Sequence, residues 1–68
     1  MTVKIDDTEL TIFEGARLKD AMQTYKRLTG RRFGFKTSMV VNSEGFEIMP
    51  DGALTNGICL FTKPRRNE

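Results

Sequence analysis

The side chains in this sequence with the most chemical potential are one cysteine and an acidic turn. Cys59 is the one thiol, and the sequence contains no histidine that could activate it as a nucleophile. Its position inside an apolar segment favours a small packing residue over a catalytic group. Asp6, Asp7 and Glu9 could ligate a divalent ion, although a solvated turn explains the same residues. We therefore expect a protein that is not an enzyme and that holds no metal and no cofactor.

Basic residues gather in two parts of the chain, around the sequence GRRFGF and at the C-terminal end. They are Lys26, Arg27, Arg31, Arg32, Lys63, Arg65 and Arg66. The two glycines of GRRFGF could shape a loop that cradles a phosphate, although their spacing matches no phosphate-loop motif. A solvated basic surface is the alternative. The net charge of +2, from 11 basic and 9 acidic residues, is modest for a protein that binds nucleic acid.

Short elements must position these residues. Residues 2–6 and 9–13 alternate between apolar and polar side chains and flank turn-forming residues, which predicts a β-hairpin. Apolar residues recur at spacings of three and four between 15 and 30, which predicts one amphipathic helix over roughly 16–28, closed by Gly30. The apolar stripe of this helix contains Leu18, Ala21, Met22, Tyr25 and Leu28.

The second half of the chain predicts further strands. Residues 37–42 and 46–48 form a second hairpin, with Met39 and Val41 on one face. Residues 58–63 are apolar on both faces, which is typical of a central strand. Pro64 ends this strand, so we expect a single domain over 1–63 and a basic, flexible tail over 64–68. Residues 30–36 form either a loop or an extended segment.

The order of a hairpin, a helix and further strands, with a central last strand, is similar to the β-grasp fold of ubiquitin-like proteins. The resemblance implies an α+β fold, in which one helix packs across a mixed sheet of four or five strands. Segments 3–21, 39–48 and 51–61 resemble the small sulfur-carrier proteins of thiamine and molybdopterin synthesis. The first segment resembles equally the start of plant-type [2Fe–2S] domains and of small β-grasp domains attached to RNA-binding enzymes.

The departures from these families concern their chemistry. Sulfur carriers end in Gly-Gly, because a flexible, unhindered terminus must enter the activating enzyme. This chain ends in TKPRRNE, with no glycine pair and with the rigid Pro64. A [2Fe–2S] cluster requires four cysteine ligands, and the chain has one cysteine. The resemblance therefore predicts the fold and assigns no catalytic residue.

From these observations the sequence predicts a non-catalytic, sulfur-carrier-like adaptor that binds a protein partner through its sheet. Val41, Ile58 and Leu60 would hold the scaffold. The residues expected to contact the partner are Phe46, Phe61, Arg65 and Arg66. Phe13, Phe35, Phe46 and Phe61 could form an exposed apolar patch on the second face of the sheet. Alternatively, Phe33, Phe35 and Met49 could complete the core.

The alternative function is a small nucleic-acid-binding module that contacts phosphates through the basic loop and tail. Its contact residues would be Lys26, Arg27, Arg31, Arg32 and Lys63. No apolar run approaches the ~18 residues of a membrane span, and the N-terminus lacks the pattern of a signal peptide. With a single cysteine, a disulfide framework is impossible. We therefore expect a cytoplasmic protein without membrane contact, as a monomer or weak homodimer.

Overall fold

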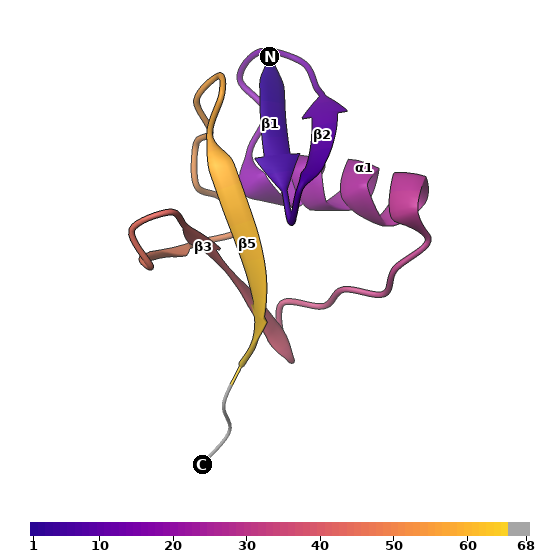
Figure 1. Ribbon diagram of the computed structural model, residues 1–68, viewed down its shortest axis with the longest axis vertical. Helices are drawn as coiled ribbons and strands as arrows, with labels where there is room; N and C mark the ends of the chain where they lie inside the picture. The colour runs from indigo at the N-terminus through magenta and orange to yellow at the C-terminus, as the bar shows by residue number, and fades with distance from the viewer. Residues whose placement is uncertain (66–68) are drawn as a thin grey trace.

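A single mixed sheet with one helix on one of its faces makes up the structure (Figure 1). This computed structural model describes residues 1–65. The elements are β1 (Thr2–Ile5), β2 (Thr8–Thr11), α1 (Leu18–Thr29), β3 (Ser38–Asn42), β4 (Glu47–Ile48) and β5 (Cys59–Pro64). The strand order is β2-β1-β5-β3-β4; β1 and β5 are parallel and the other neighbours are antiparallel. The predicted α+β fold class is confirmed, and this strand order is compatible with a β-grasp.

The first hairpin is closed by a tight two-residue turn at Asp6 and Asp7. Both residues have positive φ angles, of 47° and 69°. Positive φ at both central residues is the requirement of the type I′ turn, whose twist matches that of the flanking strands. Because the turn needs only these two residues, Ile5 pairs with Thr8. The strands are therefore 2–5 and 8–11. Both end earlier than the predicted 2–6 and 9–13, and the second begins one residue earlier.

Helix α1 begins two residues later than predicted, and its first amides are satisfied by a distant loop. The main-chain N–H of Leu18 donates to the carbonyl of Gly52 at 3.0 Å, and that of Lys19 donates to Pro50 at 2.9 Å. The carboxylate of Asp20 accepts a hydrogen bond from the N–H of Arg17 at 3.0 Å. The predicted end of the helix is confirmed, since Gly30 has a φ of 70° in the left-handed region and its N–H donates to Lys26.

The core lies between α1 and the sheet. The helix contributes Leu18, Ala21, Met22 and Tyr25, as its periodicity predicted. The sheet contributes Val3, Ile5, Leu10, Val40 and Leu60. Leu28 was predicted to belong to the same stripe, but this is wrong: its side chain is 64% exposed. Figure 1 gives the reason, because the last turn of α1 projects past β2 and has no sheet beneath it.

The two faces of the sheet differ in what covers them. Val40 belongs to the core between the helix and the sheet. Its neighbour Val41 points to the opposite face of the sheet, because successive side chains of a strand alternate. The long connections 30–37 and 49–58 place Phe33, Phe35 and Leu54 against the core. These connections thus run on the helix side. Within residues 1–65 the opposite face carries neither a helix nor a loop, and we call it the open face.

Strand β5 is longer than the part of the sheet that the helix covers. β1 pairs with its first half only, through Lys4 with Cys59 and Ile5 with Leu60, while β3 pairs with β5 as far as Pro64. Pro64 was expected to end the strand before it, yet it is the last residue of β5. The N–H of Thr62 points toward β1, and two residues later the nitrogen of Pro64 faces the same side, where β1 has already ended. The missing N–H of proline therefore breaks no ladder hydrogen bond.

Candidate functional site

The open face carries side chains from all five strands, including Glu9 of β2, which lies opposite Lys4. The register places Lys4 beside Cys59, Val41 beside Phe61, and Glu47 beside Val41. Met39 and Lys63 form the next pair along β3 and β5. Cys59 is exposed here, so the prediction that it packs inside is wrong. The strand alternation explains this outcome, because Leu60 takes the core position and its neighbour must face the other way.

At the centre of the open face lies a small apolar group. Val41 is only 2% exposed, although it is not part of the core cluster beneath the helix. Its cross-strand neighbours on this face are Phe61 and Glu47. Phe61, on the central strand, retains 39% of its exposure. The predicted partner residue Phe61 thus covers Val41 with part of its ring and offers the rest to solvent.

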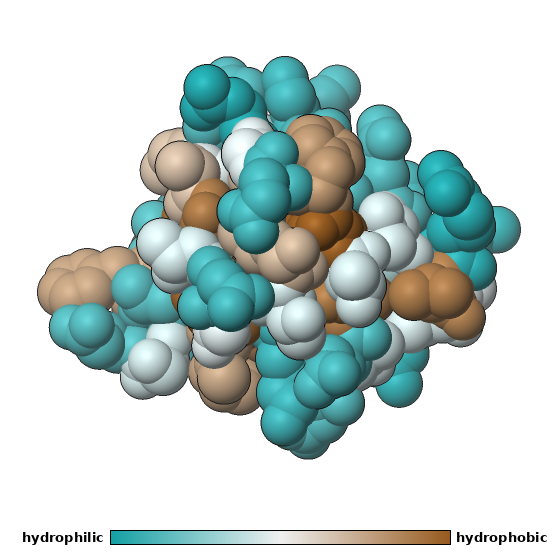
Figure 2. Space-filling view, turned by 90° about the horizontal axis from the view of Figure 1, so that it is seen from above, coloured by the Kyte–Doolittle hydropathy of each residue, from teal (hydrophilic) through white to brown (hydrophobic). Residues whose placement is uncertain are grey.

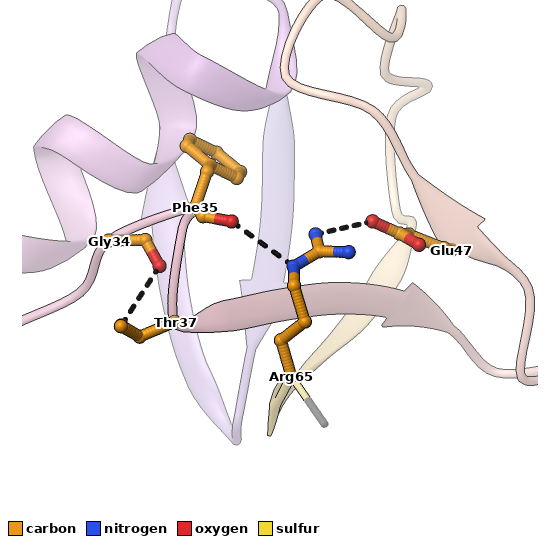
Figure 3. Close-up of polar contacts among 5 residues, drawn as sticks. All are labelled: Gly34, Phe35, Thr37, Glu47 and Arg65. Atoms are coloured by element: carbon orange, nitrogen blue, oxygen red, sulfur yellow. Dashed lines mark hydrogen bonds and ion pairs between the residues drawn. The ribbon is translucent and has the colours of Figure 1, made fainter. Parts of the chain in front are cut away.

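Arg65 forms contacts within the protein. Its guanidinium lies 2.7 Å from the carboxylate of Glu47, and its Nε donates to the carbonyl of Phe35 at 3.2 Å (Figure 3). Its main-chain N–H donates to Thr37 at 2.9 Å. Arg65 therefore connects the end of β5, the 30–37 connection and the edge strand β4. The other predicted basic contact, Arg66, lies outside the described residues.

Phe46 lies in the turn between β3 and β4, away from Phe61. Its main chain is fixed, because its N–H donates to the Asn42 side chain at 3.0 Å and its carbonyl accepts from the Asn42 N–H at 2.9 Å. Its ring is 66% exposed. Strand β3 separates the turn from the central strand that carries Phe61. The structure therefore does not bring these two predicted contact residues into one group.

The remaining phenylalanines were predicted either to form an exposed apolar patch or to complete the core, and the structure shows both outcomes. Phe33 and Phe35 pack against the core, and their rings meet edge to face with centroids 4.9 Å apart. Met49 does not complete the core, since it is 58% exposed, and Phe13 is 64% exposed. Seen from above in Figure 2, apolar side chains form separate groups between hydrophilic ones. This end of the molecule therefore presents no single continuous apolar patch.

Basic residues that are distant in sequence meet in a hollow on the helix side, beyond the part of the sheet that α1 covers. We call it the basic hollow. It measures about 320 Å³ and is lined by Tyr25, Arg31, Arg32, Phe33, Ser38, Thr62, Lys63 and Pro64. Three of the predicted nucleic-acid contacts, Arg31, Arg32 and Lys63, are brought together here. No carboxylate is among the lining residues within the described part of the chain.

The loop that carries the arginines is positioned by two short turns. The left-handed Gly30 turns the chain away from α1, and the N–H of Arg31 donates to the hydroxyl of Thr29 at 3.2 Å. The carbonyl of Gly34 accepts hydrogen bonds from the N–H groups of Thr37 and Ser38, which leads the chain into β3. The two glycines of GRRFGF therefore shape the path of the loop. They were the sequence signal for this site, but no pattern in the sequence pointed to Tyr25 or Thr62 as further lining residues.

Lys26 and Arg27 lie outside the basic hollow. Lys26 lines a second hollow of about 290 Å³, between α1 and the rings of Phe33 and Phe35. Arg27 is exposed in the last helical turn. Both cations lie at the negative end of the helix dipole, which explains basic residues at these positions without any ligand. The predicted set of five therefore separates into three residues that meet in one hollow and two with a role in the helix.

No group of three or more His, Cys, Asp or Glu side chains within residues 1–65 could hold a metal ion. Within the same range, no helix has both the length and the apolar character needed to cross a membrane. No protein family matches the sequence, and no curated protein matches it either. The arrangement of side chains is thus the basis for any functional conclusion.

Proposed function

We propose that this chain is a non-catalytic, ubiquitin-like adaptor, similar in fold to sulfur carriers, that binds a protein partner in the cytoplasm through the open face. The observation that carries the proposal is Phe61. It lies on the central strand, faces the side without a helix and retains 39% of its exposure. A large aromatic ring at the centre of an uncovered sheet is a typical anchor for a protein interface.

The charges around Phe61 indicate the chemistry of the partner. Lys4 lies beside Cys59 on β1 and opposite Glu9 on β2, and Lys63 lies near the end of β5, where it also lines the basic hollow. Neither lysine forms an ion pair within residues 1–65. Glu47, the acidic residue beside Val41, is already paired with Arg65. Charges of both signs therefore lie around Phe61, and the open face suits a partner that presents an apolar side chain with polar and charged groups of both signs around it.

A photo-crosslinking amino acid at position 61 tests this proposal in lysate of the native cell. The same crosslinker at position 13 is the control, because Phe13 is also exposed but lies in the connection between β2 and α1. We expect one protein that is captured from position 61 and not from position 13. Once purified, that protein should bind the F61A variant at least 10-fold more weakly than the wild type. Equal capture from both positions, or unchanged affinity of F61A, contradicts the proposal.

A second candidate function, a nucleic-acid-binding module, is favoured by the basic hollow. Arg31 and Arg32 meet Lys63, more than thirty residues later in the sequence, with no lining carboxylate among the described residues. Such a group of cations would bind phosphates with an affinity that falls steeply as salt rises. Binding of a short single-stranded oligonucleotide, measured between 50 and 300 mM salt, tests this function. An affinity that does not depend on salt contradicts it.

A further inference from the structure

The basic hollow combines positive charge with aromatic side chains. Arg31, Arg32 and Lys63 line it, and none of them forms an ion pair within residues 1–65. Tyr25 and Phe33 line the same hollow. Cations attract phosphate, and an aromatic ring offers a surface on which a planar base can stack. A ligand that carries both a phosphate and a flat ring would use both properties.

The polar groups of the hollow are compatible with an anion. Ser38 and Thr62 also line it, and of these two only Thr62 has its hydroxyl already donated to a carboxylate of the described residues. The hydroxyl of Thr62 donates to the carboxylate of Asp6, and the N–H of Thr62 donates to the same carboxylate. Asp6 itself does not line the hollow. Its negative charge is thus turned toward β5 and is engaged there, while the cations line the hollow itself.

The ring of Phe33 is held in place. It packs against the core and meets Phe35 edge to face at 4.9 Å, with the two ring planes at 88°. An aromatic side chain whose position is fixed before binding loses little entropy when a base stacks on it. The volume of about 320 Å³ is at the lower end of the range for small-molecule sites. This size suits one nucleotide and excludes a longer stretch of chain.

We infer that the basic hollow binds a single nucleotide, with its phosphate toward Arg31, Arg32 and Lys63 and its base against Phe33. The nucleotide is either free or an unpaired unit of a single strand, because a base inside a duplex cannot reach the ring. This inference deepens the second candidate function and rests on it, and it shares only Lys63 with the adaptor proposal. It identifies a nucleotide as the ligand of the hollow, whereas the positive charge alone would indicate only a phosphate.

The first test compares ligands on the wild-type protein. Adenosine monophosphate, ribose 5-phosphate, inorganic phosphate and a single-stranded 8-mer are titrated while NMR signals are followed. Tyr25 is the only tyrosine in the sequence, so its ring signals report the hollow without overlap from another tyrosine. Stacking of one base predicts that the mononucleotide binds at least about 5-fold tighter than ribose 5-phosphate. Equal affinities of these two ligands overturn the inference.

The 8-mer distinguishes the two sources of the nucleotide. If the hollow takes one unit of a strand, the 8-mer binds tighter than the mononucleotide, and its affinity depends more steeply on salt. If the ligand is a free nucleotide, the 8-mer gains nothing over the mononucleotide. Either outcome supports a nucleotide site, provided that the base contributes to the affinity.

The second test uses a matched pair of variants. F33L removes the ring from the basic hollow, and F35L removes the neighbouring ring, which packs against the same core but lines only the second hollow. We expect about 10-fold weaker binding of the mononucleotide by F33L, and a loss of less than about 3-fold by F35L, which removes the neighbour of Phe33 but leaves the ring of Phe33 in the hollow. Thermal denaturation shows whether both variants remain folded. Should F33L unfold, the comparison of ligands on the wild type still decides the question.

A pair of charge variants distinguishes the nucleotide site from the more general nucleic-acid-binding function on which it rests. R31A/R32A removes two cations from the hollow, while K4A/K19A removes the same charge elsewhere. We expect the first to reduce the salt slope for the 8-mer by about 1.4, and the second to leave it unchanged. If R31A/R32A weakens binding but F33L does not, the nucleotide site is wrong and the phosphate-binding function stands. If no ligand binds at millimolar concentration and low salt, both are wrong.

Discussion

Asp6 and Thr62 join the turn of the first hairpin to the central strand, since the Asp6 carboxylate accepts hydrogen bonds from both the N–H and the hydroxyl of Thr62. The N–H of Asp6 donates in turn to the carbonyl of Leu60 at 3.0 Å. β1 ends at Ile5, so this carboxylate takes the place of the next main-chain acceptor in the parallel ladder with β5. The acidic turn that resembled a cation site is therefore part of the sheet.

Replacement of Asp6 by alanine should destabilise the fold. D6A leaves the N–H of Thr62 without its acceptor and puts a residue with no local hydrogen bond at a φ of 47°. We expect a loss of about 2 kcal/mol in the free energy of unfolding, or about 10 °C in the melting temperature. D6N, which tolerates the left-handed region and keeps one acceptor, should lose less than half as much. Urea denaturation of both variants checks this, and a wild-type stability for D6A contradicts it.

The pair of Arg65 and Glu47 should contribute measurably to stability. The two side chains are 34% and 25% exposed, and the guanidinium also holds the carbonyl of Phe35. A double-mutant cycle with R65A, E47A and the double variant isolates their interaction. We expect a coupling free energy of about 1 kcal/mol at low salt, above the median of surface pairs because both groups are partly buried.

Salt gives the control for this cycle. At 0.5 M NaCl the coupling between Arg65 and Glu47 should fall, whereas the matched cycle for Lys19 and Asp51 should start close to zero. That second pair lies 3.1 Å apart, but its side chains are 55% and 79% exposed. Equal coupling in the two cycles would mean that Arg65 does not fix the end of β5 to β4.

The sequence allowed the helix, the hairpins and the central position of the last strand to be predicted, because these depend on local patterns. The start of α1 could not be predicted in the same way. Its first amides are bonded to the carbonyls of Gly52 and Pro50, more than thirty residues later in the chain. Arg17 also forms an isolated bridge with Ala53. The local acceptor, the Asp20 carboxylate, bonds only the N–H of Arg17, and the acceptors for Leu18 and Lys19 come from a loop that folds back onto the helix.

The candidate sites also depend on contacts between residues that are distant in the sequence, so local patterns predict them only in part. The basic residues of the hollow could be named from the sequence, but their separation into Arg31, Arg32 and Lys63 on one side and Lys26 and Arg27 on the other depends on how far α1 reaches over the sheet. Val41 was predicted to belong to the scaffold, and it is buried. It is nevertheless not part of the core cluster beneath the helix. The alternation of side chains along a strand does not show which of its two faces will be buried.

Two glycines should respond in opposite ways to alanine. A Cβ added to Gly52 would lie 2.9 Å from the main-chain oxygen of Met49 and 2.9 Å from a methyl carbon of Ile48. The oxygen belongs to the turn that Gly52 closes, so it cannot withdraw freely. We expect G52A to lose more than 1 kcal/mol. At Gly34 a Cβ meets only Thr37 at 3.8 Å, so G34A should be neutral or stabilising by about 0.5 kcal/mol. Melting temperatures compare the two, and a loss in G34A as large as in G52A contradicts the assignment.

Phe61 and Phe46 should differ in stability, because only one of them covers another side chain. Phe46 is 66% exposed at a turn, so F46A should change the free energy of unfolding by less than about 0.5 kcal/mol. Phe61 lies beside the buried Val41, and F61A should cost about 1 kcal/mol because it uncovers this residue. That cost leaves the domain folded at 25 °C, so weaker partner binding by F61A can be measured on a folded protein. A loss above 3 kcal/mol would mean that the ring of Phe61 is a core residue, and the open face would then have no anchor to offer a partner.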